Sequence, residues 1–170
     1  MKAMKTLAIV ACLAAAACGE DAPTGPTTTD AVFNVALSAA NEVPPISNAE
    51  AAATGTATIT FHITRDTAAG AITGATVDFS VTLANFPAGS VARLAHIHTG
   101  PAGVAGPVLI DTGLSPAAAV ALADGTGSFS YTGVAISPEN ATAVLVNPAG
   151  YYFNVHSVLN GSGAVRGQLR

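Results

Sequence analysis

Polar and apolar residues alternate strictly between positions 54 and 64, and this period of two constrains the fold more than any other feature of the chain. Successive side chains of an extended strand point to opposite faces, so the alternation predicts a strand with one buried side. One face would carry Ala57, Ile59, Phe61 and Ile63, and the other Thr54, Thr56, Thr58, Thr60, His62 and Thr64. The same period recurs over residues 33–37, 75–83 and 127–131.

Turn-forming residues separate these segments at short intervals. The run Asp-Thr-Ala-Ala-Gly at 66–70 predicts a hairpin between 54–64 and 75–83. Further strands are expected around His96 and His98 and over residues 108–111, 151–158 and 164–169. We therefore predict an all-β fold, an antiparallel Greek-key β-sandwich with an immunoglobulin-like or superoxide-dismutase-like architecture.

One short helix is expected near residues 138–146. Ser137 is a suitable N-cap, Pro138 suits the first helical position, and Glu139 places an acid in the first turn. Apolar residues then recur at helical spacing until Pro-Ala-Gly at 148–150 ends the pattern.

The N-terminus resembles a bacterial lipoprotein signal peptide. Lys2 and Lys5 precede an apolar stretch over 6–17, which ends in the small cleavage-site residues Ala15, Ala16 and Ala17 before Cys18. The resemblance implies a signal peptide over residues 1–17, a lipid on Cys18, a flexible tether over 18–30 and a domain over 31–170. The alternative is an ordinary secretory signal cleaved nearby. Both predict export, and the first predicts a cell-envelope lipoprotein on a periplasmic or extracellular face, membrane-anchored through Cys18.

Export also determines the expected chemistry of the mature chain. Cleavage removes Cys12 and acylation uses Cys18, so neither a disulfide nor thiol chemistry is expected. Loss of the two lysines leaves four arginines against ten acidic residues. We expect no nucleic-acid partner, membrane contact only through the lipid, and an unidentified protein or envelope ligand as partner. The oligomeric state stays open.

Two of the four histidines lie within three residues, just before a Gly/Pro-rich loop at 100–107. In a strand, His96 and His98 share one side, and His156 is a candidate third ligand from a later strand. Three imidazoles suit Cu²⁺ or Zn²⁺. The alternative is a structural cluster in which the histidines bond to one another and to loop carbonyls. His62 is expected to be exposed among threonines.

Nucleophilic catalysis finds no support in the chain. No cysteine remains in the predicted mature domain, and Ser157 points away from the face of His156 if both lie in one strand. We therefore expect a binding module without catalysis that holds one metal ion through three histidines. A copper-dependent, superoxide-dismutase-like oxidoreductase and a purely structural envelope protein remain as alternatives.

Glu42 and Arg166 are notable in a chain with only 9% charged residues. They would clamp the first loop against the last strand if they form an ion pair, or they are two unrelated surface charges. The segment 41–45, Asn-Glu-Val-Pro-Pro, is stiff and suits covering a sheet edge or contacting a partner.

Three segments together resemble the CHRD domain, named from chordin and found in many bacterial secreted proteins. They are Asn-Glu-Val-Pro-Pro at 41–45, the run from His96 through the Gly/Pro loop to Val108, and Asn-Val-His-Ser at 154–157 followed by Arg-Gly-Gln-Leu at 166–169. The resemblance extends over residues 33–169. It implies an extracellular module that in animals belongs to a growth-factor-binding protein.

Overall fold

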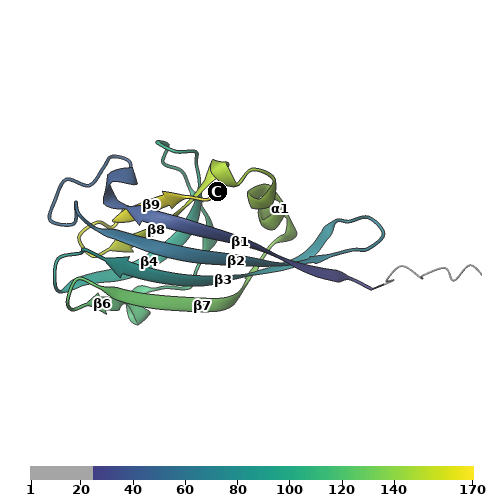
Figure 1. The fold of residues 1–170 in the computed structure, drawn as a ribbon, viewed down its shortest axis with the longest axis horizontal. Helices are drawn as coiled ribbons and strands as arrows, with labels where there is room; N and C mark the ends of the chain where they lie inside the picture. The colour runs from purple at the N-terminus through teal and green to yellow at the C-terminus, as the bar shows by residue number, and fades with distance from the viewer. Residues whose placement is uncertain (1–24) are drawn as a thin grey trace, which may run out of the picture.

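Nine strands form one antiparallel sheet in the computed structural model, which describes residues 25–170 (Figure 1). The predicted signal peptide and Cys18 lie outside the described residues. The strands are β1 (Thr27–Ser38), β2 (Thr54–Arg65), β3 (Ile72–Ala84), β4 (Ser90–Thr99), β5 (Val108–Asp111), β6 (Val120–Leu122), β7 (Gly127–Ile136), β8 (Tyr151–Ser157) and β9 (Val165–Gln168). The helices are α1 (Pro138–Val146) and the 3-10 turns η1 (Ala39–Asn41), η2 (Pro116–Ala118) and η3 (Pro148–Gly150).

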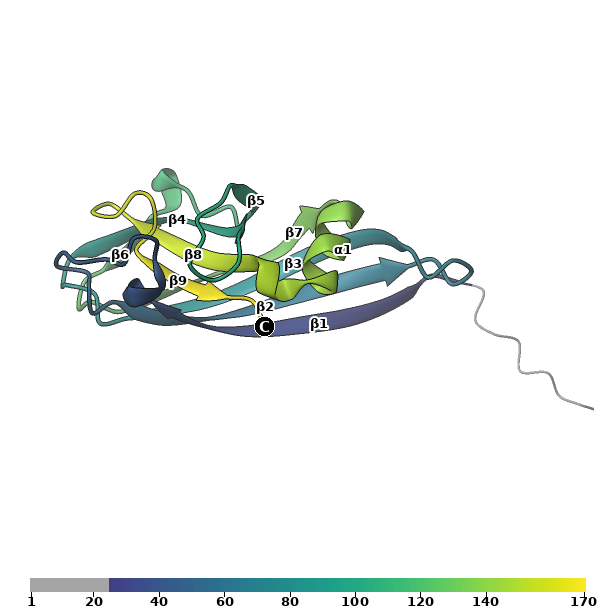
Figure 2. The same cartoon turned by 90° about the horizontal axis from the view of Figure 1, so that it is seen from above.

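The sheet curls until its ends approach each other. Its order is β5-β4-β8-β9-β1-β2-β3-β7, and β6 pairs with β4 while also contacting β7. Figure 2 shows β4, β5, β8 and β9 on one side of the long strands β1 and β2. The result is a nearly closed, barrel-like antiparallel sheet with one α-helix. The all-β class is thereby confirmed, whereas the Greek-key sandwich stays a prediction.

The first three strands form the predicted hairpin and extend it. β2 and β3 pair antiparallel, and Asp66 Oδ1 accepts from the backbone N–H groups of Ala68 and Ala69 in the turn between them. β1 begins at Thr27, within the expected tether, because its backbone pairs with β2 as far as Thr27 opposite Arg65. The side chains of residues 27–30 are all exposed. This part of the strand therefore shows no alternation of polar and apolar residues by which the sequence could have revealed it.

The core lies between the two layers of the curled sheet. Phe61, Phe79 and Phe153 are at most 1% exposed, and the Phe79 and Phe153 rings stack with centroids 5.9 Å apart. The helix has the predicted bounds, with the Ser137 hydroxyl accepting from the N–H of Asn140. It buries Ala141 and Val144. Among the described residues, no helix is long and apolar enough to span a membrane.

His62 lies on the threonine face between two carboxylates. Its Nδ1 is 2.8 Å from Asp30 Oδ1 and its Nε2 is 3.1 Å from Asp78 Oδ2. These two contacts link the neighbouring strands β1, β2 and β3 through their side chains. Hydrogen bonds to Asp30 and then Asp78 raise the pKa of His62, since both ring nitrogens donate when the ring is charged. This half-exposed histidine belongs to the outer surface of the sheet and is remote in sequence from the other three.

Candidate metal centre

The pairing of β4 with β8 brings the three predicted ligands to one face. His96 lies opposite Asn154 and His98 opposite Tyr152, while His156 lies opposite Leu94. The alternate residues of these strands, Ile97, Phe153 and Val155, enter the apolar core. The histidines therefore project from the other face, which is also buried: their exposed fractions are 6–7%.

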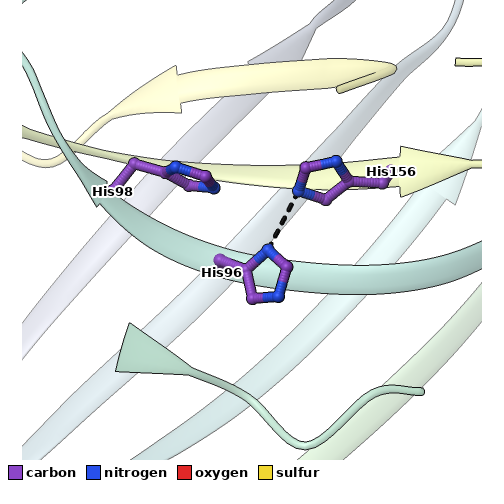
Figure 3. A group of neighbouring side chains, drawn as sticks. All are labelled: His96, His98 and His156. Carbon is purple, nitrogen blue, oxygen red and sulfur yellow. Dashed lines mark hydrogen bonds between the residues drawn. The ribbon is translucent and has the colours of Figure 1, made fainter. Parts of the chain in front are cut away.

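The three imidazoles converge as the sequence predicted. One nitrogen of each ring lies within 4.8 Å of one nitrogen of each of the others, and His96 Nδ1 is 2.9 Å from His156 Nε2 (Figure 3). Two nitrogens bound to one tetrahedral Zn²⁺ at about 2.05 Å lie about 3.3 Å apart. Closing the cluster onto an ion thus requires side-chain movements of no more than about 1.5 Å.

Hydrogen bonds to backbone carbonyls determine which ring nitrogen of His98 and of His156 carries the hydrogen and which carries the lone pair. His98 Nδ1 lies 2.9 Å from the carbonyl oxygen of Gly106, and His156 Nδ1 lies 3.0 Å from that of Gly161. A ring nitrogen facing a carbonyl must carry the hydrogen, so in each neutral ring Nε2 keeps its lone pair. His96 Nε2 is 3.9 Å from Asp111 Oδ1, which leaves its Nδ1 toward the cluster.

Burial keeps these rings uncharged. Desolvation lowers the pKa of His156 to about 4, and it also lowers the pKa values of His96 and His98. Metal ligation requires a neutral imidazole, so at neutral pH no proton has to be removed from a charged ring. Nε2 of His98 and Nε2 of His156 therefore carry lone pairs. His96 Nδ1 donates its hydrogen to His156 Nε2 in the metal-free protein, and it becomes a ligand once that hydrogen moves to His96 Nε2, which faces Asp111.

Three buried side-chain polar atoms of residues 25–170 have no hydrogen-bond partner, and they belong to neighbouring residues. They are His98 Nε2, Asn154 Oδ1 and Glu42 Oε1. A side chain at Gly163 would contact both Asn154 and the Glu42 carboxylate, which shows how closely those two groups approach. An unpartnered buried acceptor is costly, and for His98 Nε2 a bound cation would remove that cost.

Glu42 and Arg166 do not form the direct ion pair considered above. Among the described residues no nitrogen of Arg166 lies within 4.0 Å of a Glu42 oxygen, because the guanidinium lies against the Tyr152 ring and loop carbonyls. Desolvation raises the pKa of Glu42 to about 7, although the nearby Arg166 charge opposes this. Neither residue is a surface charge, since their exposed fractions are 7% and 2%.

The Arg-Gly-Gln segment of β9 organises the loops above the histidines. Arg166 Nη2 donates to the carbonyls of Pro101 and Val104, and the Gln168 amide nitrogen lies 2.7–2.8 Å from the carbonyls of Gly100, Ala149 and Tyr151. A Cβ at Gly167 would lie 2.2 Å from the Ala36 carbonyl oxygen, so glycine allows β1 to pack there. Asn41 donates to the Arg166 carbonyl, so the start of segment 41–45 lies against β9, an interior strand between β8 and β1.

Sequence reasoning missed several groups around the cluster. Tyr152 and Asn154 share the period of His156 and were detectable as neighbours on its face, but their contacts were not. Asp111 faces His96 only because the four-residue strand β5 pairs with β4. The carbonyls of Gly106 and Gly161 left no signal, because any residue type supplies a carbonyl.

Glu42→Gln should stabilise the protein at alkaline pH and not at pH 4. The unfolded carboxyl ionises near pH 4.5 and the folded one near 7, so the cost of burying the charge appears as pH rises through that interval. Glutamine avoids this cost, and we expect its advantage to grow by about 2–3 kcal/mol between pH 4 and pH 8.5. Urea unfolding of both proteins at the two pH values measures it.

Glu139→Gln is the matched control, because Glu139 is an exposed acid in the first turn of α1. Its pKa is lowered, first by a backbone hydrogen bond, so glutamine there should confer no advantage at alkaline pH. A Glu42→Gln advantage that is equal at pH 4 and pH 8.5 would show that the carboxyl is not destabilised by burial.

A protein-family model described as the CHRD domain matches residues 33–169. No curated protein and no solved structure matches the chain. The matched range runs from β1 to the residue after β9 and includes all three clustered histidines.

Proposed function

This chain belongs to the CHRD domain family, and on that premise we propose that it is a non-catalytic binding module of the cell envelope that holds one metal ion. The ligands are His96 Nδ1, His98 Nε2 and His156 Nε2. We also propose that its nearly closed sheet is a variant of the Greek-key sandwich expected from the sequence, with β1–β3 in one layer and β4, β8 and β9 in the other.

The orientation of the rings is the observation that carries the metal proposal. Two imidazoles are fixed by carbonyls at Nδ1, and the Nε2 atom of one of them, His98, is buried without a partner. A purely structural cluster would use that nitrogen. The hydrogen bond between His96 and His156 satisfies only their two facing nitrogens, and an ion would replace it with two metal–nitrogen bonds.

Titration of the metal-free protein with Zn²⁺ and with Cu²⁺ at pH 7.5 tests the proposal. We expect one ion per chain and competition between the two metals for the same site, with Cu²⁺ bound more tightly because imidazole sites follow the Irving–Williams order. Calorimetry gives stoichiometry and affinity. Absence of stoichiometric binding of either ion would leave the histidines as a structural hydrogen-bonded cluster.

The three-histidine set also favours a second candidate, a copper-dependent oxidoreductase, because three ligands leave a coordination position for a small molecule. The copper-loaded protein should be assayed for superoxide and dye turnover beside free Cu²⁺. Turnover above that of the free ion, lost in His98→Ala, would replace the non-catalytic proposal.

Lipid anchoring is proposed from the sequence of the first eighteen residues. Cys18→Ser should move the protein from the membrane fraction into the soluble exported fraction, because acylated Cys18 would be the mature chain's hydrophobic anchor. Fractionation of cells expressing each form measures this. Cys12→Ser is the control and should leave the protein in membranes, whereas continued membrane association of Cys18→Ser would contradict the anchor.

A further inference from the structure

Arg166 connects β9 to the loop that follows the histidine strand. Its Nη2 donates to the carbonyl of Pro101 at 3.0 Å and to that of Val104 at 2.9 Å. These two carbonyls belong to the turn at the tip of the Gly/Pro loop, where Val104 N–H also bonds back to Pro101. The buried Arg166 side chain thus binds both carbonyls of this turn and stabilises its conformation.

The same guanidinium also contacts the aromatic neighbour of a ligand. Its central carbon lies 3.3 Å from the centroid of the Tyr152 ring, a cation–π contact. Tyr152 in turn stacks nearly parallel on the His98 ring, with centroids 4.9 Å apart and an interplanar angle of 8°. Arg166 therefore reaches His98 through a stack of planar groups.

The loop and the stack meet again at Gly106. The Tyr152 hydroxyl accepts from the N–H of Gly106, and the Gly106 carbonyl accepts from His98 Nδ1. A Cβ at Gly106 would lie 1.8 Å from the Thr99 carbonyl oxygen, so the loop packs here against the end of β4 with no room for a side chain. The carbonyl that orients His98 is thus held by the loop conformation that Arg166 and Tyr152 support.

We propose that Arg166 is a positioning residue for the metal centre, which holds the 100–107 loop and the Tyr152 ring so that His98 presents Nε2 to the ion. This inference rests on the proposed metal function. The side chain has no contact with the ligand nitrogens and acts through Pro101, Val104, Tyr152 and Gly106.

The chemistry of the contacts explains why arginine occupies the position. A planar guanidinium can lie flat on an aromatic ring while one terminal nitrogen donates to two carbonyls in its plane. Lysine keeps the charge and can reach one carbonyl, but its tetrahedral ammonium cannot reproduce the stack. Arg166→Lys therefore separates the charge of the residue from its geometry.

The test compares wild type, Arg166→Lys, and the control Arg65→Lys. Arg65 is suitable because its Nη1 also donates to a backbone carbonyl, that of Gly70, but in the exposed turn between β2 and β3. In the metal-free proteins, long-range proton–nitrogen NMR of the imidazoles reports the tautomer of His98. Titration with Zn²⁺ alone then gives the affinity of each variant.

We expect an Nδ1–H tautomer for His98 in wild type and in Arg65→Lys, and a mixture of tautomers in Arg166→Lys. Zn²⁺ affinity should fall by about 10–100-fold in Arg166→Lys, the range seen when groups that orient ligands are lost. A merely structural role would lower the unfolding midpoint without changing the tautomer. Retention of the wild-type tautomer and affinity in folded Arg166→Lys would overturn the inference.

Two further outcomes are distinguishable. If wild type binds no Zn²⁺ or Cu²⁺, the metal proposal fails, and the tautomer measurement alone decides whether Arg166 positions His98. If Arg166→Lys does not fold, Tyr152→Phe decides, because it keeps the stack but removes the hydroxyl that holds Gly106. An unchanged tautomer and affinity in Tyr152→Phe would then contradict the inference.

Discussion

His98→Ala lowers the affinity for Zn²⁺ by at least about 100-fold and leaves the protein folded. The substitution removes one of the three ligands. The two that remain, His96 and His156, are too few protein ligands to hold Zn²⁺ tightly. The metal-free fold should tolerate the change, because the ring projects from the face opposite the apolar core, and alanine there removes only the stack on Tyr152 and one hydrogen bond, to the Gly106 carbonyl. Calorimetric titration at pH 7.5 measures the affinity.

His62→Ala is the matched control for this loss. His62 has both ring nitrogens engaged by Asp30 and Asp78, and it projects from β2 rather than from β4 or β8. Its removal should leave the affinity unchanged. Equal affinities in wild type and His98→Ala would exclude His98 as a ligand, and a loss in His62→Ala would place the ion at the surface carboxylates instead.

Phe153→Ala destabilises the protein by about 3–5 kcal/mol, the largest stability effect that we expect from one substitution. Phe153 is fully buried, stacks on Phe79, and joins the β8 layer to the β3 layer. Alanine leaves a cavity between two sheet layers that are held by many other contacts and cannot collapse freely. The free energy of unfolding in urea at 25 °C measures the loss.

The exposed Val158→Ala provides the comparison, with an expected change within about 0.5 kcal/mol because the side chain of Val158 is largely in solvent. Phe153 lies on the core side of β8, between Tyr152 and Asn154, so Zn²⁺ should still bind the folded fraction of Phe153→Ala. A loss below about 1 kcal/mol would contradict the packing between the two layers.

The fold was predictable where one face of a strand is buried. Alternation located β2 and β3 to within a few residues, and capping chemistry located α1 at Ser137. The early start of β1 and the short strand β6 were missed for physical reasons. Residues 27–30 are exposed on both faces, and the three residues of β6 are too few for a period to show. The closure of the sheet depends on contacts between distant strands, which no local pattern encodes.

The sequence was enough to predict which histidines form the candidate site. It was not enough to predict the groups that surround and orient their rings. The period of two indicated that His96 and His98 share a face and that His156 could meet them from a later strand, and the structure brings all three together on one face of the paired strands β4 and β8. The orientation of the rings comes from carbonyls of Gly106 and Gly161, whose positions follow from loop conformation. For the same reason Arg166 turned toward loop carbonyls and Tyr152 instead of pairing directly with Glu42.

A crystal structure of the Zn²⁺-loaded protein, with anomalous data collected on both sides of the zinc absorption edge, tests the central claim most directly. We predict one zinc peak per chain, about 2.0–2.1 Å from His96 Nδ1, His98 Nε2 and His156 Nε2. The Nδ1 atoms of His98 and His156 should keep their bonds to Gly106 and Gly161. No peak among these three rings, or a peak beside His62 with the three imidazoles still bonded as in the metal-free protein, would contradict the account.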